Sequence, residues 1–76
     1  MTEATELAAV RRVASDGSAR RIRRAAGLSL AEVANELGVT IGTVSKWETG
    51  ARSPRRAAAL KYAEVLRQLL EVEALP

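Results

Sequence analysis

The chain has 76 residues and a net charge of +3, and 47% of its residues are hydrophobic but only 3% aromatic. It contains no Cys, His or Phe, so zinc sites, thiol catalysis and Ser-His-Asp chemistry lack the side chains they need. We therefore expect a protein that is not an enzyme and that binds no metal and no cofactor. The lack of an 18-residue apolar run and of a secretion signal favours a cytoplasmic protein that contacts no membrane.

The positive charge is concentrated in two blocks. Residues 11–24 carry a net charge of +5 and residues 46–61 carry +4, whereas each of the three remaining segments is −2. Basic blocks in an acidic background are typical of a surface that meets the phosphates of a nucleic acid. Arginines that merely solvate helix faces are the alternative explanation.

Helix signals account for the first third of the chain. Residues 2–14 place apolar side chains at helical spacing between an acidic start and a basic end, as the helix dipole favours. Turn residues at 15–18 interrupt this helix. A second helix over about 18–26 is expected to end at Gly27 in the left-handed conformation.

A capping box marks the start of a third helix. Ser29 and Glu32 are spaced so that each side chain satisfies one free amide of the first helical turn. The helix is expected to cover residues 29–37 and to stop at Gly38, after barely three turns.

Residues 39–44 are ambiguous by local propensity. Five of these six residues are β-branched, which favours a strand, whereas Thr40 can also cap a helix over 41–48. Spacing favours the helix, because only three residues separate it from the preceding helix and the first of them is glycine. Two short helices joined so tightly meet at a large angle, which predicts a helix-turn-helix at 29–48. Gly42 makes its second helix a poor helix former that depends on tertiary packing.

The final helix is expected over about 54–73, with Ser53 as its N-cap and Pro54 at its first position. Its apolar residues fill two adjoining stripes, a wider arc than one packed face requires. The stripes contain Ala59, Leu60, Ala63, Leu66 and Leu70, and Tyr62, Val65, Leu69 and Val72. Fifteen of the residues are Ala, and large core side chains are scarce. The apolar surface of this helix that exceeds one packed face therefore predicts burial against a second copy of the chain.

The segment from Leu28 to Pro54 resembles the helix-turn-helix domain of phage repressors and Cro proteins, also called the XRE type. Its most specific part is Ser-Lys-Trp-Glu-x-Gly-x-Arg-x-Pro at 45–54, and the resemblance covers about residues 18–66. It implies an all-α, compact, lambda-repressor-like bundle of about five short helices. In this family the second helix of the pair lies in the major groove of DNA.

The resemblance implies which residues of the groove helix meet base edges. They are Ile41, Gly42, Ser45 and Lys46. Ile41 and Gly42 stand where the family often has polar amides, but Ile41 can contact a thymine methyl group and Gly42 can permit a close backbone approach. Lys46 is the main candidate for direct readout, by donating to guanine O6 or N7. A phosphate contact or a solvated lysine is the alternative for Lys46.

Contacts to the DNA backbone are implied at six further positions. They are Ser29, Thr40, Thr43, Arg52, Arg55 and Arg56. Hydroxyl groups and free amides at helix starts bind phosphate, as do cationic side chains. Arg55 stands where related proteins reach a narrow minor groove. Solvated arginines in a first helical turn are the alternative for Arg55 and Arg56.

Three conspicuous residues are assigned a structural role instead. Arg23 and Glu48 match an internal ion pair of the family that ties the preceding helix to the groove helix. Trp47, the single tryptophan, is expected to pack over the helix junction rather than to stack on a base.

These assignments divide the chain into an N-terminal extra helix or arm at 1–15 and a DNA-binding domain at 16–76 that ends in a long helix. We expect a sequence-specific regulator of transcription, specifically a repressor, that binds double-stranded DNA as a homodimer and is associated with the nucleoid. A phage Cro or immunity repressor and the antitoxin of a toxin–antitoxin pair both fit. The alternative is a protein-interaction module that uses the same fold to bind a toxin or another protein.

Overall fold

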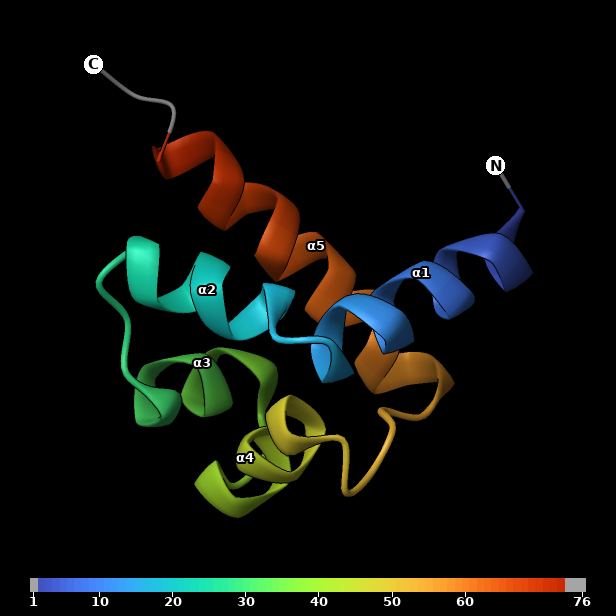
Figure 1. The fold of residues 1–76 in the computed structure, drawn as a ribbon, viewed down its shortest axis with the longest axis horizontal. Coiled ribbons are helices and arrows are strands. Elements are labelled where there is room, and N and C mark those ends of the chain that lie inside the picture. The colour runs from blue at the N-terminus through green and yellow to red at the C-terminus, as the bar shows by residue number, and fades with distance from the viewer. Residues whose placement is uncertain (1, 74–76) are drawn as a thin grey trace.

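The computed structural model describes residues 2–73, which form five helices and no strand (Figure 1). In chain order the helices are α1 (Glu3–Ser15), α2 (Ser18–Ala25), α3 (Leu30–Leu37), α4 (Ile41–Thr49) and α5 (Arg56–Glu73). The expected all-α bundle of about five helices is confirmed, and the strand alternative at 39–44 is wrong. Within the described range, no helix combines the length and the apolar character that crossing a membrane requires.

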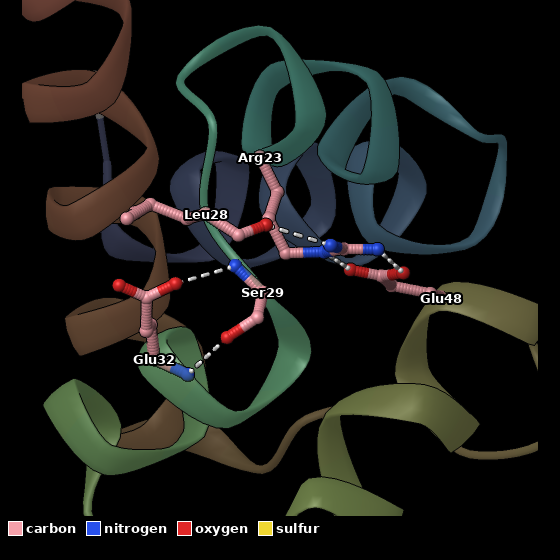
Figure 2. A network of polar contacts seen from close by, with 5 residues as sticks. All are labelled: Arg23, Leu28, Ser29, Glu32 and Glu48. Atoms are coloured by element: carbon pink, nitrogen blue, oxygen red, sulfur yellow. Dashed lines mark hydrogen bonds and ion pairs between the residues drawn. The ribbon is translucent and has the colours of Figure 1, made fainter.

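Local capping sets both ends of α3. The backbone amide of Ser29 donates to Oε1 of Glu32 at 2.9 Å, and the amide of Glu32 donates to Oγ of Ser29 at 3.1 Å, as Figure 2 shows. At the other end Gly38 adopts a φ of 72°, which side chains with a Cβ rarely tolerate. The amide of Val39 then donates back to the carbonyl of Ala34 at 3.0 Å. This arrangement ends α3 and turns the chain directly into α4.

The start of α5 differs from the expectation. The helix begins at Arg56, its first carbonyl acceptor belongs to Arg55, and Pro54 lies in the preceding loop rather than at the first helical position. Pro54 is fully buried, and its carbonyl accepts a hydrogen bond from Nε of Arg11 at 3.0 Å. Burial of the proline ring and pairing of its carbonyl with α1 therefore hold this residue in the loop before α5, and Ser53 does not cap the helix.

All five helices contribute to one core. Its buried apolar members are Val10, Ala14, Ala19, Val33, Ala34, Leu37, Val44, Trp47, Ala59, Tyr62, Val65 and Leu66. Several of them are alanines, which let the helix backbones approach one another closely. The rings of Trp47 and Tyr62 pack together with their centroids 5.2 Å apart, and burial raises the pKa of Tyr62 to about 12.

The wide apolar arc of α5 is covered mainly from within the chain. α1 and α2 pack against α5, so Ala59 and Leu66 are buried and Ala63 is half-buried. Leu70 and Val72 stay 48% and 54% exposed. Most of the apolar surplus that the sequence assigned to a second copy is thus buried by other helices of the same chain. Among the described residues, the large apolar side chains of α5 that stay exposed are Leu70 and Val72, near its C-terminal end.

Candidate nucleic-acid interface

α4 has one buried and one open side. Val44 and Trp47 are buried in the core, to which α3 contributes Val33, Ala34 and Leu37. The four candidate base-contacting residues have the spacing of a single helix face. Ile41 is 51% exposed, Gly42 and Lys46 are exposed, and Ser45 is half-buried. The structure therefore leaves this face of α4 accessible along its length.

Two threonines organise the start of α4. Oγ1 of Thr40 accepts a hydrogen bond from the amide of Thr43 at 3.2 Å, and the two hydroxyl oxygens are 2.9 Å apart. This capping leaves the amides of Ile41 and Gly42 at the positive end of the helix dipole without intrahelical partners. Such a helix start, with two hydroxyl groups beside free amides, is suited to a phosphate oxygen.

Three cationic side chains meet at a hollow beside the open face of α4. The hollow has a volume of about 310 Å³ and is lined by Thr43, Lys46, Trp47, Arg52, Ser53, Arg55 and Ala58. Lys46, Arg52 and Arg55 form no salt bridge with any carboxylate in residues 2–72. The amide of Arg52 donates to the carbonyl of Lys46 at 3.2 Å, which folds the loop back onto α4. Positive charge is thus gathered without a neutralising group at this place.

The predicted phosphate contact at the start of α3 has a different environment. The Glu32 carboxylate accepts the amide hydrogen bond of Ser29, and this bond lowers the pKa of Glu32. A negative charge therefore stands at the helix start, where it competes with a phosphate. The hydroxyl of Ser29 accepts from the Glu32 amide but keeps its own hydrogen for donation.

Arg56 is drawn toward α1 and away from the other cations. Its guanidinium forms a two-point ion pair with Glu3, in which Nη2 lies 3.1 Å from Oε2 and Nε contacts Oε1. The two side chains are 67% and 46% exposed, and the hydrogen bond from Arg56 lowers the pKa of Glu3. Of the two adjacent arginines predicted to contact DNA, only Arg55 therefore lines the hollow.

A buried ion pair fixes α4 against the rest of the molecule. Arg23 of α2 donates from Nε to Oε2 of Glu48 at 2.7 Å and from Nη2 to Oε1 at 3.0 Å. Its Nη1 donates to the carbonyl of Leu28 at 2.9 Å (Figure 2). The side chains of Arg23 and Glu48 are only 10% and 6% exposed, and the hydrogen bonds that Arg23 donates to Glu48 raise the pKa of Arg23. One guanidinium therefore joins α2, α4 and the segment that leads into α3.

Sequence reasoning missed two contacts beside this interface. Arg11 holds the Pro54 carbonyl and Glu3 holds Arg56, over separations of 43 and 53 residues. No local signal identifies either partner, because the first helix contains other arginines and glutamates at equivalent surface spacing.

The fold and this arrangement define a class of protein: a helix-turn-helix protein whose second motif helix is open beside a basic hollow. The model of the family described as helix-turn-helix matches residues 20–71. The chain belongs to this family, the Cro/C1-type or XRE-type group of DNA-binding regulators, and the resemblance found in the sequence is confirmed. α1 precedes the matched range. No match was found among curated proteins or among solved structures.

Proposed function

We propose that this protein is a sequence-specific repressor of transcription that acts in the cytoplasm on the DNA of the nucleoid. The observation that carries the proposal is the hollow beside α4, where Lys46, Arg52 and Arg55 gather without acidic partners among the described residues. α4 enters the major groove, and the loop that follows it lies along the phosphate backbone.

Base edges are read from the open face of α4. Lys46 donates to guanine, Ile41 contacts a thymine methyl group, Gly42 allows the backbone to approach, and Ser45 supplies a short hydroxyl. The exposure of Ile41 supports this role, because an isoleucine 51% open to water at a helix start gains burial in a groove.

Phosphates are bound on both sides of these base contacts. The ligands are Thr40 and Thr43 with the free amides of α4, Ser29 at the start of α3, and Arg52, Arg55 and Arg56 after the groove helix. Glu3 lies beside Arg56 and Glu32 lies beside Ser29. Because these carboxylates repel a phosphate, Arg56 and Ser29 contribute less to phosphate binding than the other ligands.

The regulator acts as a homodimer on a palindromic site, with half-site centres one helical turn apart, roughly 34 Å. The exposed Leu70 and Val72 at the end of α5 support an apolar contact between copies. A phage Cro or immunity repressor and an antitoxin remain the two biological settings that fit, and an antitoxin also binds its toxin.

Binding to pooled genomic fragments, followed across a series of salt concentrations, tests the proposal. We expect the logarithm of the binding constant to fall by about 0.9 per phosphate contact for each tenfold rise in salt. Selection from random duplexes should yield a palindrome, and light scattering should give a dimer. A folded protein that shifts no duplex even at low salt would refute DNA binding and favour the protein-interaction module.

A further inference from the structure

α1 lies before the range matched by the family model, yet it contacts the segment that carries the DNA-facing arginines. This segment, residues 50–55, connects α4 to α5 and includes Arg52 and Arg55. Figure 1 shows the C-terminal part of α1 beside the start of α5.

Three residues of α1 lie beside residues 50–56, and their order along the chain is opposite to the order of the residues that they face. A methyl group placed on Gly50 would lie 3.6 Å from Cβ of Ser15. Arg11 holds the carbonyl of Pro54, and Glu3 holds Arg56 just past the connection. The three α1 residues are spaced by eight and by four positions, so they share one side of the helix. α1 therefore lies close to both ends of the connection.

The Arg11 contact is the best-defined of the three. Pro54 is fully buried, and within the described part of the chain its carbonyl has no hydrogen-bond donor besides Nε of Arg11 at 3.0 Å. A buried carbonyl requires a partner, and a proline cannot donate to the preceding backbone. The backbone of the connection is otherwise tied to α4 through the amides of Gly50 and Arg52, and to α5 through the carbonyl of Arg55, which accepts from the amide of Ala59. Arg11 is therefore the residue through which α1 anchors the connection at Pro54.

We propose that Arg11 is a positioning residue for DNA binding: it acts through Pro54 to hold the connection so that Arg52 and Arg55 face the phosphates. The inference rests on the proposed function and assigns α1 a part in it. An anchored connection loses less conformational freedom when it binds than an unanchored one. The side chain of Arg11 itself touches no DNA in this proposal.

Arg11→Met and Arg12→Met form a matched pair that tests the proposal. Both remove one positive charge at adjacent positions of α1, but Arg12 is exposed and its side chain makes no hydrogen bond within residues 2–72. Dissociation constants are measured for a duplex selected with the wild-type protein, over a range of salt, at a temperature where circular dichroism shows each variant folded. We expect Arg11→Met to bind about 8-fold more weakly than Arg12→Met at 0.1 M salt, with a slope shallower by about 0.9, as the loss of one phosphate contact requires.

Arg11→Lys and Arg12→Lys keep the charge and form a second matched pair, for use if Arg11→Met is not folded. Lysine lacks the fixed Nε donor of the guanidinium, so Arg11→Lys should bind about threefold more weakly than Arg12→Lys. Equal affinities and equal slopes within the folded pair would overturn the positioning role, while wild-type binding would leave the proposed function standing. Failure of the wild-type protein itself to bind any duplex would instead reject the proposed function, and the inference with it.

Discussion

Arg55 and Arg56 are neighbours in the chain, but their side chains lie in different surroundings. Arg55 lines the hollow with Lys46 and Arg52 and has no carboxylate partner among the described residues. Arg56 is bound by Glu3 of α1. A count of charges along the sequence treats the two as equivalent, whereas the structure neutralises one and leaves the other available. The availability of a charge for DNA thus depends on its pairing within the fold.

The ion pair between α2 and α4 and the ion pair between α1 and α5 differ in their exposure to water. The pair of Arg23 and Glu48 is almost completely buried, and that of Arg56 and Glu3 is largely open to water. Charges held in a buried, fully hydrogen-bonded pair cannot be separated without leaving an unsolvated charge. An exposed pair exchanges easily with water or with a phosphate. The first pair therefore acts on folding and the second on the charge presented to DNA.

The largest effect is expected from Glu48→Gln, which leaves the Arg23 charge buried without its counter-ion. Breaking one half of such a pair costs about 3–5 kcal/mol, a large part of the about 5–15 kcal/mol that stabilises a typical domain. Urea unfolding followed by the fluorescence of Trp47 measures the loss. Replacing both Arg23 and Glu48 by Met should recover part of the stability. A loss below about 1 kcal/mol in the single variant would contradict the assigned role.

Lys46→Ala and Arg52→Ala test whether Lys46 recognises a base while Arg52 binds a phosphate. Loss of a lysine contact to guanine should reduce discrimination at one base position by about 1–3 kcal/mol. Loss of Arg52 should weaken every duplex alike, by about 8-fold at 0.1 M salt. Competition between the selected duplex and single-base variants of it measures both effects. Equal, sequence-independent losses from the two variants would remove the readout role of Lys46.

Arg55→Ala and Arg56→Ala test the opening contrast directly, because they remove the same charge at adjacent positions. Arg55→Ala should weaken binding by about 8-fold at 0.1 M salt and make the salt slope shallower by about 0.9. Arg56→Ala should change both quantities less, because Glu3 already neutralises this arginine. Both the affinity and its salt slope are measured by titrating one labelled duplex with each variant. If Arg56→Ala proves the more damaging variant, the ion pair with Glu3 does not persist in solution.

The smallest effect is expected from Glu3→Gln, which frees Arg56 for a phosphate. Affinity should rise by between about 2- and 8-fold at 0.1 M salt, and the melting temperature should hardly change because the pair is exposed. Glu6→Gln is the matched control, with the same charge change on α1 but no salt bridge in the described residues. Adding Arg56→Ala to Glu3→Gln should abolish the gain. An equal gain from Glu6→Gln would show that only overall charge matters.

Much of the fold follows from local chemistry and was predictable. The first four helices begin and end within one residue of their expected positions, because capping hydrogen bonds and glycines such as Gly38 act over at most a few residues. The start of α5 was not predictable from the same rules. Ser53 and Pro54 have the composition of a helix start, but burial of Pro54 places them in the connection instead.

The sequence by itself determined the helix-turn-helix, through the three-residue spacing and the Ser-Lys-Trp-Glu segment, and it supplied the candidate residues at 41–46 and 52–56. Only the tertiary structure decided which charges remain available and what the first helix does. The helical state of α4 also depends on it, because Gly42 disfavours a helix and burial of Val44 and Trp47 compensates. Contacts such as those of Arg11 and Glu3 join residues more than 40 positions apart, and only packing selects them from equivalent surface residues.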